Sequence, residues 1–180
     1  MTSNLRQRVY VACPSAQAKS HLASFFDAHR MSDGVIRLAL RVPLLSAAGD
    51  ELALERDVIA SLEPLPKGAN EALQGTRIQW KPNGRSFPAF EGTLVAEHDE
   101  QYSSFILTLS GSYVPPFGVA GAAFDAVLGN RFAEATAHQL LRDIAESIEK
   151  DYRACEAFKS KEREIEAAKT LATQSGSRAG

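Results

Sequence analysis

One arginine has the chemistry of a ligand anchor. Arg56 lies in the segment Leu52 to Leu62, which alternates between apolar and polar residues. The residues that share its face are Leu54, Val58 and Ala60. A guanidinium on an apolar face stays charged and therefore needs a partner. That partner is either an oxygen of a ligand (carboxylate, phosphate or enolate) or an acid of the protein itself, and a bulge that turns Arg56 outward is a further solution.

Aromatic residues form a second candidate group. On the predicted inward side of their strands lie Trp80, Phe90, Phe105 and Tyr113, with Leu107 between the last two, and Phe117 and Phe124 follow in the segment that closes the fold. Such a set can line an apolar pocket, with the Trp80 N–H and the Tyr113 hydroxyl as polar groups that orient a ligand. It can equally fill a core, and the sequence leaves both interpretations open.

Two small residues complete the candidate site. Ala133 and Ala137 lie where the C-terminal helix should cross the sheet, and they either leave volume for a ligand or allow close packing of helix on sheet. The predicted ligand-binding residues are therefore Arg56, Val58, Trp80, Phe90, Phe105, Leu107, Tyr113, Phe124, Ala133 and Ala137.

Known catalytic and metal-binding signatures do not occur in the sequence. It has no Gly-x-Ser-x-Gly, no phosphate-binding glycine loop ending in Lys, no dinucleotide fingerprint and no His-Glu-x-x-His. The histidines are scattered, at His21, His29, His98 and His138. Cys13 and Cys155 lie far apart and form no Cys-x-x-Cys pair. We therefore predict no catalytic set, no metal site and no cofactor.

Alternating segments predict the strands that must position these residues. They are Arg8 to Cys13, Val35 to Leu44, Leu52 to Leu62, Thr76 to Trp80, Phe90 to His98 and Phe105 to Tyr113. Turn residues separate several of them, including Ala47-Ala48-Gly49-Asp50 and Pro82-Asn83-Gly84. One apolar and one polar face is typical of an antiparallel sheet with a single wet side, and the spacing predicts a six-stranded meander.

Helical periodicity appears after the first strand and after the last. A helix is expected from the N-cap Ser15 to about Ala28. A short helix is expected over Val119 to Leu128, ended or kinked by Gly129-Asn130, and a long one from Arg131 onward. The apolar stripe of the long helix consists of Ala133, Ala137, Leu140, Leu141, Ile144 and Ile148. The prediction is thus an α+β fold in which a bent antiparallel sheet wraps around a long C-terminal helix, with a short helical insertion after the first strand.

Composition places limits on the kind of protein. A chain of 180 residues predicts one domain, over residues 1–152, followed by a charged helical extension and a disordered tail over 153–180. A net charge of −2 argues against nucleic-acid binding. No apolar segment is long enough to span a bilayer, and the N-terminus has no apolar signal-peptide segment. We therefore expect a cytoplasmic protein with reduced cysteines.

The order of elements resembles the helix-grip fold of the START-like, or SRPBCC, superfamily. The residues most similar to its bacterial members are Gly111-Ser112-Tyr113-Val114-Pro115-Pro116-Phe117-Gly118, Gly121, Phe124-Asp125 and Arg131-Phe132-Ala133-Glu134-Ala135-Thr136, continued by Leu140-Leu141 and Ile144-Ala145. The resemblance covers residues 6–152 and implies a hydrophobic cavity between sheet and helix that holds a lipid, a polyketide-like molecule or another apolar ligand. No aromatase or cyclase catalytic set matches this sequence residue by residue.

Three functions follow as hypotheses. The first is binding or transport of a small apolar molecule, with Arg56 or Tyr113 orienting its polar end. The second is a polyketide cyclase or aromatase that uses the same cavity, with Arg56, Tyr113 and His98 as candidate acid or base groups. The third is an interaction module in which the charged helix from Lys150 to Lys169 pairs with a partner or with a second copy in a homodimer.

Overall fold

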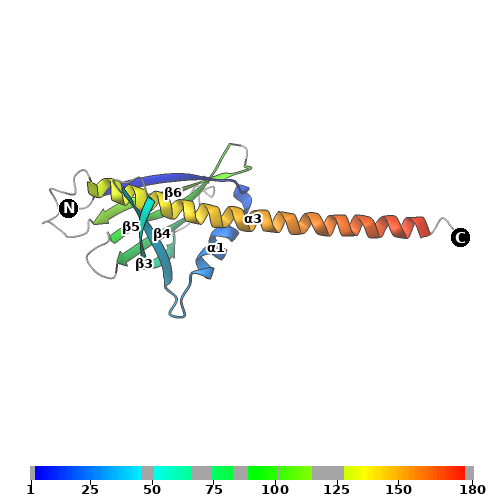
Figure 1. The fold of residues 1–180 in the computed structure, drawn as a ribbon, viewed down its shortest axis with the longest axis horizontal. Coiled ribbons are helices and arrows are strands. Elements are labelled where there is room, and N and C mark those ends of the chain that lie inside the picture. Colours follow the sequence, from blue (N-terminus) through cyan, green and yellow to red (C-terminus); the bar gives the residue numbers. More distant parts are fainter. Residues whose placement is uncertain are drawn as a thin grey trace.

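A long helix lies across a curled sheet and continues far beyond it (Figure 1). A computed structural model describes residues 3–45, 51–65, 74–82, 89–100, 102–114 and 128–176. The strands are β1 (Ser3–Val11), β2 (Ile36–Leu45), β3 (Glu51–Pro64), β4 (Gln74–Pro82), β5 (Ala89–His98) and β6 (Phe105–Val114). The helices are the 3-10 turn η1 (Ser15–Gln17), α1 (Ala18–Ala28) and α3 (Leu128–Gly176). The predicted α+β class is confirmed.

The strand order corrects the predicted six-stranded meander. The sheet runs β1-β6-β5-β4-β3-β2 and every pair is antiparallel. Strands β2 to β6 form a meander, but β1 pairs with β6, so that Ser3 lies opposite Tyr113 and Val11 opposite Phe105. This pairing also explains why β1 begins at Ser3, earlier than the apolar alternation indicated.

Alternation assigns the two faces of the sheet. In β5, Phe90, Leu94 and Ala96 are buried while Glu91 is exposed. Paired residues of antiparallel strands point to the same side, so the register carries this apolar face across the whole sheet. The buried side is the concave one, against which α3 packs.

A pair of glycines allows the sheet to bend. Gly92 of β5 and Gly111 of β6 lie opposite each other on the concave face. A Cβ atom built on Gly92 would approach the backbone oxygen of Ser110 and would lie 2.6 Å from Cζ of Phe90 and 2.8 Å from Cα of Gly111. Only glycine fits this close approach of two backbones beneath the Phe90 ring.

Helix α3 covers both edges of the sheet. It packs against β1 at one edge and β2 at the other, with β6 beneath it. Its buried residues include Ala133, Ala137, Leu140, Leu141, Ile144, Ala145 and Ile148, which confirms the predicted stripe. Because exposed strand edges invite pairing with other chains, this arrangement also protects the sheet.

Several predicted boundaries differ from the structure. Helix α1 is capped by Gln17 without a side-chain hydrogen bond, because Ser15 lies in the preceding 3-10 turn. The expected end of a helix at Gly129-Asn130 is wrong, since both residues lie within α3. Residues 173–176, expected to be disordered, are the last turn of α3.

Some predictions concern residues outside the described ranges. They are the turns at 47–50 and at 83–84 and the short helix over 119–127. Among the helices that are described, none combines the length and hydropathy needed to cross a membrane.

Candidate functional site

A row of large side chains crosses the concave face. Trp80 of β4 lies opposite Phe90 of β5, which lies opposite Tyr113 of β6, and Ala60 of β3 continues the row. The Trp80 and Phe90 rings stack with centroids 4.4 Å apart and an interplanar angle of 21°. All four residues are buried. The sequence prediction that these aromatic residues share one side is therefore confirmed.

The remaining predicted residues on the sheet extend this apolar surface. Val58 precedes Ala60 on the same face of β3, and Phe105 and Leu107 occupy the concave face of β6; all three are buried. They belong to one hydrophobic cluster together with the row above. Phe124 and Phe117 lie outside the described residues.

The direction of α3 determines where Ala133 and Ala137 lie relative to the sheet. Glu149 accepts a hydrogen bond from the Ala12 amide at the end of β1 (2.8 Å). Ala137 and Ala133 lie about 18 and 24 Å back along the helix at 1.5 Å per residue. That offset brings them to the end of the sheet where β1 begins and where Tyr113 lies, as the start of α3 in Figure 1 also indicates. Two small, buried residues therefore lie on the helix at the level of the aromatic row.

Arg56 occupies the concave face but is not buried. It pairs with Leu40 of β2, which is fully buried, and the register passes through it without a bulge. The Arg56 side chain itself is exposed, and no ion pair joins it to another described residue. The expectation that Arg56 needs a partner on an apolar face is not met, because this part of β3 extends beyond the pairing with β4, which runs from Val58 to Pro64, and solvent reaches the side chain. The position suits contact with the polar end of a molecule whose apolar part lies further in.

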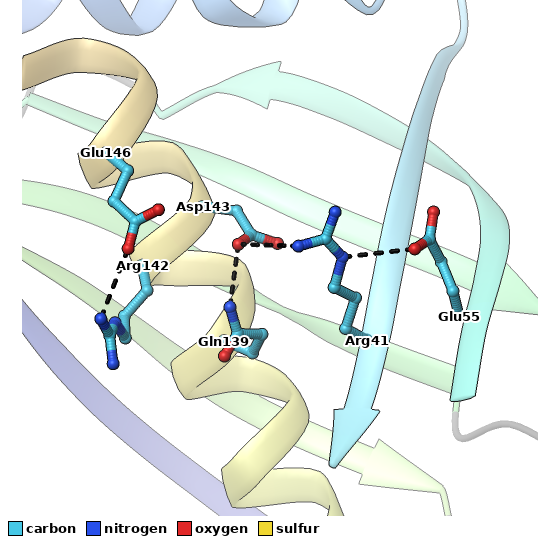
Figure 2. A network of polar contacts seen from close by, with 6 residues as sticks. All are labelled: Arg41, Glu55, Gln139, Arg142, Asp143 and Glu146. Carbon is cyan, nitrogen blue, oxygen red and sulfur yellow. Dashed lines mark hydrogen bonds and ion pairs between the residues drawn. The ribbon is translucent and has the colours of Figure 1, made fainter. Parts of the chain in front are cut away.

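A second arginine, which the sequence did not single out, ties the sheet to the helix (Figure 2). Arg41 of the edge strand β2 contacts Glu55 of β3 (3.3 Å) and Asp143 of α3 (3.9 Å). Gln139 donates a hydrogen bond to the same carboxylate oxygen of Asp143 (2.9 Å). Arg41 alternates with the buried Leu38 and Leu40 and therefore points outward, but an outward side chain on an edge strand can bend around that edge to reach the helix.

The groups considered for acid–base chemistry do not lie together. His98 pairs with Phe105 at one end of β6, and Tyr113 lies eight residues away, about 26 Å along the strand. The His98 ring stacks on Tyr102 (4.9 Å), an exposed residue with a φ of 56° in the β5–β6 connection. Arg56 is three strands away from Tyr113. These positions do not form one catalytic constellation.

Cys13 lies where β1, η1 and α3 meet. It is fully buried, and burial, with a smaller contribution from the Glu149 carboxylate, raises the pKa of its thiol above the ordinary 9.0. A thiol with a raised pKa remains protonated and unreactive at neutral pH. Cys13 is therefore a packing residue, and no group of His, Cys, Asp or Glu among the described residues could hold a metal ion.

The outer face carries a feature that the sequence did not predict. Behind the glycine pair lies an open depression of about 530 Å³. Its lining consists of Leu5, the two glycines and six polar residues: Asn4, Arg77, Glu91, Thr93, Ser110 and Ser112. The Thr93 and Ser110 hydroxyls lie 3.2 Å apart and share a hydrogen bond. This depression lies on the opposite side of the sheet from the predicted apolar site. The two glycines within an alternating pattern were the sequence signal for an irregular surface here.

Comparison with known proteins identifies no family. No family model and no curated protein matches this sequence. Among solved structures, the chain is similar to the crystal structure of TTHA0849 from Thermus thermophilus, with 14% sequence identity, 81% of this chain and 97% of that chain covered, and a TM-score of 0.47. A likeness at this level carries no information about ligand or activity.

Proposed function

We propose that the protein binds a small apolar molecule between the concave face of the sheet and α3. The observation that carries this proposal is the Trp80–Phe90–Tyr113 row, which lies at the level of the small residues Ala133 and Ala137. Apolar surfaces with a few polar groups at one end are typical of small-molecule sites. Arg56, exposed on the same face four residues from Ala60 of the row, supplies such a polar group.

Two further attributions belong to the same proposal. The first is membership of the START-like superfamily, to which the bent antiparallel sheet and the closing helix are suited. The second is a cytoplasmic location, which is supported by two free cysteines, Cys13 and Cys155. Free thiols persist in reducing compartments.

Native mass spectrometry of protein purified without detergent tests the proposal directly. We expect a mass above 19.5 kDa that returns to this value on denaturation, with release of an apolar compound. If the protein emerges without a bound molecule, a titration with apolar probes follows. Trp80 is the only tryptophan, so its fluorescence reports on the concave face specifically. A probe that binds there should quench it.

A matched pair of substitutions distinguishes a ligand site from a filled core. Ala137→Phe adds a ring at the level of the aromatic row, whereas Ala23→Phe adds the same ring to the exposed face of α1. If the proposal is right, Ala137→Phe abolishes binding and lowers the melting temperature by less than about 3 °C, because the ring enters ligand space. Overpacking a filled core costs about 1–3 kcal/mol, or roughly 2–12 °C for a chain of this size.

Two results together would contradict the proposal. They are a large loss of stability in Ala137→Phe, with Ala23→Phe unaffected, and the failure of every apolar probe to change Trp80 fluorescence. The concave face would then be an ordinary protein core.

A further inference from the structure

Helix α3 continues well beyond the domain that it closes. Its last residue in contact with the core is Tyr152, which is partly buried. Side chains from Arg153 to Lys169 are exposed, with Glu156 intermediate, and the helix extends to Gly176. Figure 1 shows this part projecting away from the sheet. At 1.5 Å per residue the projection is about 36 Å long, and an isolated helix without tertiary contacts is only marginally stable in water.

The apolar residues of the projection lie beside the line of the buried stripe. At 100° per residue, the buried stripe would continue through positions 155, 158, 159, 162 and 166. Three of these are charged: Lys159, Glu162 and Glu166. Phe158 (63% exposed) lies five turns after the buried Leu140, in line with one edge of the stripe, and Ile165 (55% exposed) lies about 20° further around the helix. They belong to a second face, whose centre lies about 100° from the centre of the stripe.

This second face has the spacing of a coiled-coil seam. Ala154, Phe158, Lys161, Ile165, Ala168 and Ala172 follow one another at intervals of four and three residues. Such a pattern packs side chains of one helix between those of another. Lys161 is the one charged residue in it.

We propose that this seam, from Phe158 to Ala172, binds the same seam of a second copy of the chain in antiparallel orientation. The inference is independent of the proposed ligand site. In a parallel pair, each Lys161 would face the Lys161 of the second copy, and two ammonium groups would share one layer of the interface. An antiparallel pair places Lys161 opposite an alanine instead.

Charges beside the seam are complementary in this orientation, and a parallel pair would likewise bring Lys169 opposite a carboxylate, that of Glu164, so the orientation rests on Lys161. In an antiparallel pair, residues on one side of the seam of the first helix lie next to residues on the same side of the seam of the second helix. Glu162 and Lys169 are seven residues apart on one side, so Glu162 of each copy meets Lys169 of the other, and Ile165 packs against Ala168 of the other.

The geometry of the chain accommodates this dimer. The overlapping segments lie between residue 157 and Gly176, beyond Tyr152, so the two domains sit at opposite ends of the helical pair and do not collide. The interface is small, and small interfaces give weak, reversible association. We therefore expect a dissociation constant in the micromolar range or above.

Sedimentation equilibrium of the full chain under reducing conditions tests the proposal. Reduction is needed because Cys155 is exposed and could form an adventitious disulfide. The mass should rise from 19.5 kDa toward twice this value over concentrations from about 1 µM to about 1 mM. Ile165→Asp should remain monomeric. Circular dichroism of each variant verifies that α3 remains helical.

A charge-exchange cycle tests orientation and register. Glu162→Lys and Lys169→Glu should each raise the dissociation constant about tenfold, and the double exchange should restore it. Arg163→Glu, on the side of α3 opposite the seam, should have no effect.

Three outcomes would overturn the proposal. The first is a monomer at every concentration. The second is a dimer that Ile165→Asp does not dissociate. The third is a dimer with the response of a parallel pair, in which Lys169 meets Glu164 of the other copy. In that case Lys169→Glu weakens the dimer, Glu162→Lys leaves it unchanged, and the double exchange does not restore it.

Discussion

Replacement of Gly92 by alanine tests the account of the bend. The new methyl group would collide with backbone atoms of β6, namely the Ser110 carbonyl oxygen and Cα of Gly111, and with the Phe90 ring. Side-chain rotation cannot relieve a collision with backbone. Strand β6 also cannot retreat easily, because the pairs Leu94–Leu109 and Phe90–Tyr113 hold it on either side of the glycine.

The expected magnitude follows from this geometry. Gly→Ala at a position with ordinary φ normally stabilises a protein by about 0.4–1 kcal/mol through the unfolded state. Overpacking costs about 1–3 kcal/mol, and the backbone contacts put Gly92→Ala at the upper end of that range. For a chain of this size a loss of about 3 kcal/mol lowers the melting temperature by roughly 6–12 °C.

A matched glycine provides the control. In Gly75→Ala the nearest atom to the new methyl group belongs to the flexible Leu65 side chain, and Val95 Cγ2 lies at 3.4 Å. Thermal unfolding should therefore shift by no more than about 3 °C. The Phe90→Leu background separates the collision with the ring from the collision with the backbone. Gly92→Ala should still destabilise the protein when Phe90 has been replaced by leucine. A melting temperature for Gly92→Ala within about 2 °C of the parent protein would refute this explanation of the bend.

Two other predictions concern the contacts of α3. Arg41→Ala should lower stability by about 1 kcal/mol in thermal unfolding, because it removes two exposed ion pairs that contribute about 0.2–1 kcal/mol each. The loss should become smaller in high salt. Arg37 is exposed on the same strand, and Arg37→Ala should have little effect in the same assay. The raised pKa of Cys13 means that the folded state keeps this proton at pH values where the unfolded state releases it. The free energy of unfolding should therefore decline as the pH rises above the ordinary thiol pKa of 9.0. Urea unfolding of Cys13→Ala should show a smaller decline over the same pH range. An equal decline in the variant and the parent protein would exclude Cys13 as its source.

The sequence predicted the faces of elements better than their partners. Alternation in β3 and β5 identified the concave side because side chains on a strand point to opposite faces with a period of two residues. It could not reveal that β1 pairs with β6, since Ser3 and Tyr113 are distant in sequence and no local pattern links them. Topology is decided by which edge remains free after the meander has formed.

The alternation also does not show how deeply a residue on the apolar face is buried. Arg56 and Val58 have the same phase in the alternation, yet Val58 is buried and Arg56 is exposed. The difference arises from how far along β3 its neighbours and α3 cover the strand, which is a property of the assembled fold. Arg41 shows the converse, because an outward residue on an edge strand reaches α3 around the edge.

Closure of the sheet restricts how a ligand could reach the concave face. The two free edges of the sheet, β1 and β2, are both covered by α3. Separation of α3 from either edge would break buried contacts of residues such as Leu141 and Ile144 and expose unpaired strand backbone, which costs more than a local opening. An entry path at the strand ends avoids this cost. Arg56 lies on the part of β3 that extends beyond its pairing with β4, so the exposed guanidinium is placed beside such a path, where a polar group of an entering molecule would arrive last and remain in contact with water.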